Sequence, residues 1–175
     1  MDLKVKIREI PNWPKPGVNF KDITTLLSDP EAFKEVINSL GEFFVGKNID
    51  KVMSIDARGF LVAAPVAYKI GAGLIIARKP GKLPFSTIKQ EYTLEYANNI
   101  IEMHNDAIVK GEKVVLIDDL IATGGTAIAA CDLVEKLGGT IAGIGAIIDL
   151  PYLDGSKKLA ERGYEIKYLV SYDRE

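Results

Sequence analysis

Residues 114–127 read VVLIDDLIATGGTA, and this stretch indicates the fold class of the chain. A run of branched apolar residues leads into two adjacent acids, Asp118 and Asp119, and then into a loop of Thr and Gly that opens into an Ala-rich, helix-like segment. A buried parallel strand that turns into a helix has this pattern. The stretch therefore predicts a strand–loop–helix unit with two carboxylates at the carboxyl end of its strand.

The same alternation of strand and helix extends over most of the chain. Residues after Ser28-Asp29-Pro30 have helical spacing of apolar side chains, with the acid as a cap and the proline in the first turn. Further strands are predicted at 52–55, 74–77, 114–117, 140–148 and 166–170, and further helices at 61–70, 126–137 and 156–162. Pro65 is expected to start or kink the helix that contains it. The pattern predicts an α/β fold with a mostly parallel, twisted sheet flanked by helices.

A chain of 175 residues predicts a single domain over residues 1–175. Within this domain, residues of about 1–30 are expected to form an N-terminal arm. The exception to the alternation is residues 80–103, where EYTLEYANN (91–99) has an apolar residue at every second position. This period predicts an antiparallel hairpin or a long mobile loop instead of a crossover helix.

Composition excludes several classes of function. The 22 Lys and Arg against 24 Asp and Glu give a net charge of −2, which provides no polycationic face for nucleic acid. Cys131 is the only cysteine, so an internal disulfide and a cysteine metal cluster are both excluded. It shares a helical stripe with apolar residues, which predicts a core position. No apolar run suits a signal peptide or a membrane span, and a cytoplasmic protein is the simplest interpretation.

The loop after the two acids has the chemistry of an anion site. Its residues Ala122, Thr123, Gly124, Gly125 and Thr126 combine two glycines, which let backbone N–H groups face a ligand, with hydroxyls at the start of a helix. The loop lacks the lysine of the P-loop and the spacing of the dinucleotide motif. The acids would repel a phosphate next to them, so a ribose 5-phosphate fits better, with its hydroxyls on the carboxylates. The alternative is that Asp119 and Thr126 only cap the helix.

This stretch resembles the substrate signature of the type I phosphoribosyltransferases, which bind 5-phosphoribosyl 1-diphosphate (PRPP). Further segments resemble the adenine phosphoribosyltransferase family in order and spacing: PKPGVNFKDIT (14–24), DARGFL (56–61), RKPGKLP (78–84) and YTLEY (92–96). The likeness covers about residues 14–150. It implies the fold of that family and a purine salvage reaction in which adenine and PRPP give AMP and diphosphate.

The resemblance implies a role for each motif. Asp118 and Asp119 would bind the ribose hydroxyls and stabilise the cationic sugar, while residues 122–126 would bind the 5-phosphate. Arg58 and the basic cluster Arg78, Lys79 and Lys82 would bind diphosphate; from the residues alone, that cluster is better explained by a solvated basic turn. Mg²⁺ is expected to arrive with PRPP and to be held mainly by substrate and water, with no dedicated metal site in the protein.

The family's mobile loop corresponds to residues 80–99, and it implies that Glu95 donates a proton to adenine, with Tyr96 beside it. This role requires burial to raise the pKa of Glu95; in an open loop the residue is an exposed strand glutamate. Phe20 would stack on adenine, the backbone around it, including Lys21, would bind the ring edge, and Leu150 would close the opposite face. The arm of about 1–30 would thus cover the base. Phe20 as a core residue is the alternative.

Two other functions remain open at this level. One is transfer to another purine base; against it, residues 147–151 contain no Lys or Arg to bind a 6-oxo group. The other is a PRPP-sensing regulator, which would need a basic DNA-binding surface.

The resemblance also implies a homodimer. His104, the single histidine, has no visible catalytic partner and is expected to be structural, and Trp13 is expected to anchor the arm by packing.

Overall fold

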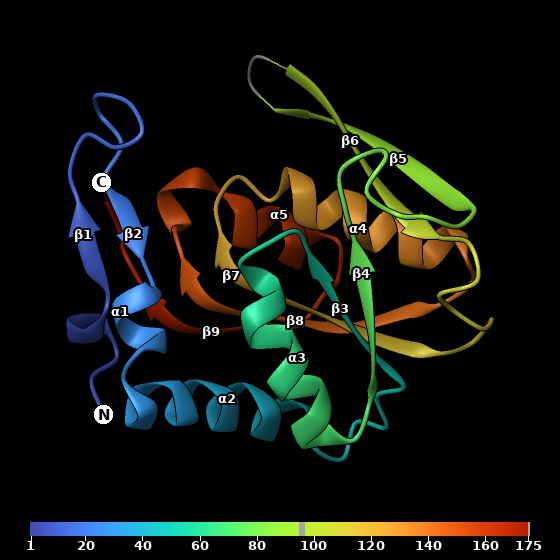
Figure 1. The fold of residues 1–175 in the computed structure, drawn as a ribbon, viewed down its shortest axis with the longest axis horizontal. Helices are drawn as coiled ribbons and strands as arrows, with labels where there is room; N and C mark the ends of the chain where they lie inside the picture. The colour runs from blue at the N-terminus through green and yellow to red at the C-terminus, as the bar shows by residue number, and fades with distance from the viewer. Residues whose placement is uncertain (95–96, 175) are drawn as a thin grey trace.

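The computed structural model describes residues 1–94 and 97–174, and for residues 93, 94, 97 and 98 it describes the backbone alone. The predicted Glu95 and Tyr96 therefore lie outside the described residues. The centre is a five-stranded sheet with the order β4-β3-β7-β8-β9, in which every neighbouring pair is parallel (Figure 1). Its strands are β3 (Lys51–Ile55), β4 (Gly73–Ala77), β7 (Lys113–Ile121), β8 (Thr140–Asp149) and β9 (Ile166–Ser171). The predicted α/β class is confirmed.

Helices cover both faces of this sheet. The helices α2 (Pro30–Phe44) and α3 (Gly59–Ile70) pack on one face, and α4 (Gly125–Lys136) and α5 (Gly155–Glu161) pack on the other (Figure 1). Val115 and Leu116 are neighbours in β7 but belong to different core clusters, because successive strand residues point to opposite faces. Cys131 is fully buried in the cluster beneath α4, as predicted, and burial raises the pKa of its thiol to about 12.

The starts of α2 and α3 were both predicted from the local sequence. The Asp29 side chain accepts hydrogen bonds from the N–H groups of Glu31 and Ala32, and Pro30 occupies the first turn of α2, as predicted. The helix α3 begins at Gly59, two residues before the predicted start at Leu61. Pro65 lies inside α3 and does not start it, so a kink is the alternative that stays a prediction.

The strand β7 is longer than the predicted 114–117. It continues to Ile121 because β8 keeps pairing with it as far as Ile121 and Asp149, so Asp118 and Asp119 lie within the strand and not after it. On its other side, the pairing with β3 ends at Met53 and Leu116. The two acids therefore extend past the end of β3, at the carboxyl edge of the sheet where ligands bind in open α/β folds.

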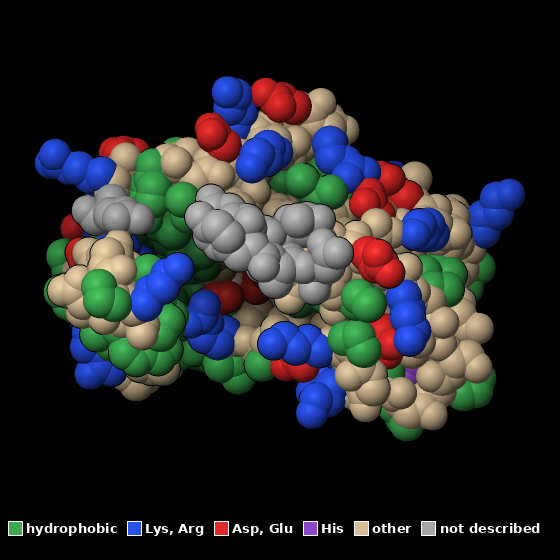
Figure 2. All heavy atoms as spheres, turned by 90° about the horizontal axis from the view of Figure 1, so that it is seen from above, with side chains coloured by type: hydrophobic (Ala, Val, Ile, Leu, Met, Phe, Trp, Pro, Cys, Tyr) green, Lys and Arg blue, Asp and Glu red, His purple; other side chains and the backbone are tan. Residues whose placement is uncertain are grey.

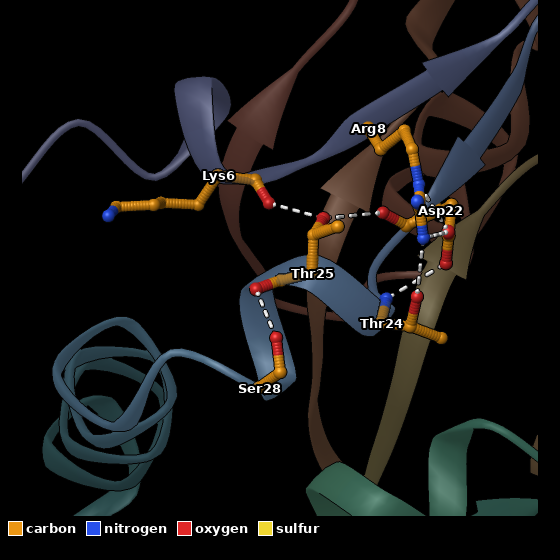
Figure 3. Close-up of polar contacts among 6 residues, drawn as sticks. All are labelled: Lys6, Arg8, Asp22, Thr24, Thr25 and Ser28. Carbon is orange, nitrogen blue, oxygen red and sulfur yellow. Dashed lines mark hydrogen bonds and ion pairs between the residues drawn. The ribbon is translucent and has the colours of Figure 1, made fainter.

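The N-terminal arm forms a small layer of its own. It contains the short 3-10 helix η1 (Lys4–Lys6), the antiparallel strands β1 (Arg8–Ile10) and β2 (Phe20–Asp22), and α1 (Thr24–Leu27). Figure 3 shows contacts that hold the arm together: Arg8 Nη2 of β1 lies 2.7 Å from Asp22 Oδ2 of β2, and the Thr25 hydroxyl of α1 donates to the Lys6 carbonyl over 2.7 Å. Trp13 is half exposed and packs edge-on against Phe20, with ring centroids 4.5 Å apart.

Residues 80–103 contain the predicted antiparallel hairpin. Its strands β5 (Thr87–Leu94) and β6 (Ala97–His104) pair along their whole length, and the hairpin packs beside α4 (Figure 1). His104 ends β6, where its ring lies edge-on to Phe85 with centroids 6.2 Å apart.

The 3-10 helix η2 (Pro151–Leu153) joins β8 to α5. Among the described residues, no helix has the length and apolar character needed to cross a bilayer.

Candidate active site

A cavity of about 400 Å³ opens at the carboxyl ends of β3 and β7. Figure 2 shows a central hollow on this side of the molecule, with acidic side chains deep inside it and Lys and Arg side chains around it. The turn after β3, the end of β7 and the loop into α4 form the walls, through Ile55, Asp56, Ala57, Arg58 and residues 118–127. The structure thus brings Arg58, both predicted acids and the whole predicted phosphate loop into one cavity.

The loop into α4 is built for an anion. Gly124 has a φ of +80° at the position before the helix, a conformation that favours glycine, and no side chain caps the first turn of α4. The backbone N–H groups of that turn are therefore left for a ligand, and the helix dipole favours a negative one. The alternative interpretation, in which Asp119 or Thr126 caps the helix, has no support in this geometry.

The two acids have different surroundings. Asp119 is buried, and its Oδ2 lies 2.7 Å from Nε of Arg58. That contact is an ion pair without the alignment of a hydrogen bond, and Oδ2 has no hydrogen-bond donor among the described residues. Asp118 is partly exposed as a whole residue, but its carboxyl group lies inside the protein, where Oδ1 accepts the backbone N–H of Asp119 at 2.9 Å. Asp119 therefore has the oxygen that is most in need of a donor such as a hydroxyl group.

Burial raises the pKa of Asp118 well above its ordinary value, and the negative charge of Asp119 raises it further. The hydrogen bond from the Asp119 N–H and the positive charge of Arg58 act in the opposite direction. Two carboxylates held together at low dielectric favour a ligand that brings positive charge or hydrogen-bond donors. A sugar that becomes cationic, or hydroxyl groups that bind a metal ion, would meet this need.

Gly59 is a site residue that the sequence did not reveal. A Cβ at this position would lie 2.5 Å from both Asp118 Oδ1 and the hydroxyl oxygen of Ser54. Ser54 is itself fixed, because its hydroxyl donates to the Ile117 carbonyl over 2.7 Å. Only glycine lets α3 begin directly against Asp118. The sequence contains this glycine in DARGFL (56–61), but the reason for a glycine there is its contact with Asp118, which is distant in the sequence.

Asp56 is a second site residue that the sequence patterns did not predict. It lines the cavity, and its Oδ2 accepts a hydrogen bond from Arg78 Nε at 2.9 Å. The peptide bond that follows it, to Ala57, is cis. Its sequence signal was an acid directly after the strand at 52–55, the same kind of position as that of Asp118. Arg78 thus reaches the cavity wall through Asp56.

The other predicted diphosphate ligands, Lys79 and Lys82, are exposed and do not line the cavity. Neither side chain has an ion-pair partner within the part of the chain that the structure describes. Exposed ammonium groups without an ion-pair partner can bind an anion without first breaking another contact.

Glu102 connects this basic turn to the hairpin. Its backbone exchanges two hydrogen bonds with Arg78, at 2.9 and 2.7 Å, and its buried carboxylate accepts the N–H of Gly81 at 3.3 Å. Lys89 Nζ lies 2.9 Å from the same carboxylate, and this contact lowers the pKa of Glu102. A movement of the hairpin is therefore mechanically linked to the turn that contains Lys79 and Lys82.

The predicted base-binding residues lie at different depths. Phe20 is partly buried, belongs to neither core cluster, and has the guanidinium carbon of Arg58 5.0 Å from its ring centre. Lys21 points the other way: its ammonium lies 2.6 Å from Glu9 and 4.1 Å from the ring centre of Tyr172. Leu150 is buried in the core, and its N–H donates to the Ile121 carbonyl. None of these three residues lines the cavity, and Phe20 contacts it only through Arg58, which does.

Comparisons with known proteins give matches over nearly the whole chain. Residues 23–171 match the family model described as phosphoribosyl transferase domain. The chain is 53% identical, over the full length of both chains, to adenine phosphoribosyltransferase from Desulfosudis oleivorans. Its fold is similar to that of the Thermoanaerobacter pseudethanolicus enzyme of the same name (TM-score 0.93, 47% identity, 98% of each chain). It is also similar to the Saccharomyces cerevisiae enzyme, solved with an imino-altritol bisphosphate and adenine (TM-score 0.89, 34% identity, 97% of each chain).

Proposed function

The chain belongs to the adenine phosphoribosyltransferase family of transferases, and from this membership we propose that it converts adenine and PRPP into AMP and diphosphate in purine salvage. The observation that carries the proposal is the single cavity that joins the phosphate loop at 122–126 to Asp118, Asp119 and Arg58. A ribose 5-phosphate has one group for each part: its phosphate for the loop and its hydroxyls for the acids.

The proposed reaction separates charge, and the arrangement of the cavity suits that separation. When the bond from ribose carbon 1 to diphosphate breaks, the sugar becomes positive and the leaving group gains negative charge. Asp119, whose Oδ2 accepts no hydrogen bond among the described residues, would stabilise the sugar, and Arg58, 2.7 Å from it, would stabilise the leaving diphosphate. Lys79 and Lys82 would add point charges on the diphosphate side.

Mg²⁺ is part of the proposal as an ion that enters with PRPP. The adjacent carboxylates of Asp118 and Asp119 are hard oxygen ligands of the kind that Mg²⁺ prefers. When bound, the ion would neutralise charge on the diphosphate.

Further elements of the proposal come from the family and from the chemistry. Glu95 would protonate adenine and Tyr96 would bind the substrate, with the hairpin closing over the cavity. Phe20 would stack on adenine, because its ring is beside Arg58 and outside both core clusters. The backbone of Lys21 and of Leu150 would complete the base site.

A cytoplasmic location is supported by the single, buried cysteine.

A homodimer also belongs to the proposal. The helix α3 and the edge strand β4 expose Leu61, Tyr68 and Leu74, and exposed apolar surface next to an edge strand favours association. Sedimentation velocity of the purified protein would test this point separately from activity.

Incubation with PRPP, Mg²⁺ and each purine base in turn tests the proposed reaction, with diphosphate release as the signal. We expect turnover with adenine and little with hypoxanthine, guanine or xanthine. Preference for a 6-oxopurine would favour the alternative transferase. Absence of turnover with every base, together with tight PRPP binding, would favour the PRPP-sensing regulator.

A further inference from the structure

The first residue of α5 packs directly on the backbone of the phosphate loop. A Cβ added to Gly155 would overlap the carbonyl oxygen of Ala122 and would lie 2.8 Å from the backbone nitrogen of Gly124. The contact is reciprocal, because a Cβ on Gly124 would lie 3.0 Å from both Cα and the carbonyl oxygen of Gly155. Two glycines from distant parts of the chain thus let two backbones touch, on the side of the loop that faces α5.

The turn that contains Gly155 is itself anchored to the sheet. The hydroxyl of Ser156 donates to Asp149 Oδ2 over 2.9 Å, and Asp149, at the end of β8, is 1% exposed. Asp149 pairs in the sheet with Ile121, the residue just before the loop. Lys158 Nζ adds a longer contact to the Thr123 carbonyl at 3.4 Å. The start of α5 therefore connects the end of β8 to the loop and supports the loop from behind.

We propose that Gly155 is a positioning residue for the 5-phosphate, acting through the backbone of residues 122–124. The inference rests on the proposed function, since it takes this loop as the 5-phosphate site. The loop binds a phosphate through N–H groups whose directions are fixed by the backbone, and hydrogen bonds weaken steeply when those directions change. A methyl group at position 155 must push this backbone toward the cavity or turn it, because backbone atoms, unlike the end of a flexible side chain, cannot rotate aside.

Gly155→Ala tests this role when it is compared with Gly145→Ala. A Cβ at Gly145 would also be crowded, 2.7 Å from Ile117 Cδ1, but its neighbours are core side chains from Ile117, Phe44 and Leu40. Calorimetric titration would give the Kd of AMP and of adenosine, which differ only in the 5-phosphate, for each variant and for the wild type. We expect Gly155→Ala to weaken AMP binding by about tenfold or more and to change adenosine binding little. Gly145→Ala should lower the melting temperature and keep the AMP preference.

Each outcome has a distinct meaning. A wild-type protein that binds AMP no better than adenosine would overturn the proposed phosphate loop and, with it, this inference. A wild type that prefers AMP, with an unchanged preference in Gly155→Ala, would overturn the inference alone. If Gly155→Ala does not fold, Ser156→Ala takes its place, because it removes the anchor to Asp149 without adding atoms. That variant should lose several-fold of the AMP preference, and an unchanged preference in it would reject the positioning role.

Discussion

Arg58 Nε lies 2.7 Å from Asp119 Oδ2, and this ion pair links the turn after β3 to the end of β7 across the floor of the cavity. The Arg58 side chain is 43% exposed and the Asp119 side chain 9%, so the pair is open to ligands on the side of Arg58. In the proposed reaction the two groups act on opposite ends of the breaking bond. Their contact in the free protein keeps both charges near the positions where opposite charges will develop, which reduces reorganisation during the reaction.

We expect Asp119→Asn to lower kcat by about 100-fold or more, because the neutral amide cannot stabilise a cationic sugar. The melting temperature should change little, since Asn has the same shape. Steady-state kinetics with PRPP and adenine, together with thermal unfolding, measure the two effects. Asp132→Asn is the matched control: Asp132 is in α4 and pairs with Arg162 outside the cavity. Parallel losses of activity and melting temperature in Asp119→Asn would contradict the prediction.

The raised pKa of Asp118 predicts a particular dependence of stability on pH. A carboxyl whose pKa is higher in the folded than in the unfolded state stabilises the protein below its unfolded pKa of about 4, and that stabilisation is lost as the pH rises through the folded pKa. Asp118→Asn removes the ionisation and keeps an oxygen to accept the Asp119 N–H. We expect this variant to be more stable than the wild type by about 1 kcal/mol at neutral pH, and to be nearly inactive.

Thermal unfolding of the wild type and Asp118→Asn between about pH 4 and pH 8 measures this effect. The difference in melting temperature should grow as the pH rises, because only the wild type acquires the buried charge. A constant difference over this range would show that Asp118 ionises in the folded protein as it does in the unfolded chain.

The sequence predicted what local patterns determine. Runs of Val and Ile gave the parallel sheet, and a strand, two acids and a Gly-rich turn gave the core of the site at 118–126. The end of β7 was placed too early because its last residues pair with β8, a contact that no local pattern contains. Gly59 and Gly155 have roles that depend on which backbone lies opposite, and the direction of the Lys21 side chain depends on the position of Glu9 and Tyr172.

We expect Phe20→Ala to raise the KM for adenine by about tenfold, because stacking of a base on an aromatic ring contributes about 1–3 kcal/mol. The KM for PRPP should stay nearly unchanged, since the phosphate loop and the acids are on other elements. Initial rates with each substrate varied separately give both constants. Tyr168→Ala, at an exposed aromatic on β9 that does not line the cavity, is the control. An unchanged KM for adenine in Phe20→Ala would assign Phe20 a packing role against Trp13.

Glu102→Gln should weaken the interaction with diphosphate while leaving adenine binding intact. The buried carboxylate holds the Gly81 N–H and the Lys89 ammonium, so a neutral side chain of the same shape loosens the turn that contains Lys79 and Lys82. We expect product inhibition by diphosphate to weaken by about fivefold and the KM for PRPP to rise by a similar factor, as for the loss of a hydrogen bond to a charged group.

The KM for adenine separates this effect from general damage to the fold, because Phe20, the proposed stacking residue for adenine, lies on the N-terminal arm and not on the hairpin. Glu91→Gln, which changes an exposed acid on the same hairpin, should alter none of these constants. If Glu102→Gln raised both KM values equally, the carboxylate would serve the fold as a whole. If it raised only that for PRPP, the hairpin and the diphosphate-binding turn would be one mechanical unit, since Glu102 is the residue whose backbone and side chain both contact that turn from β6.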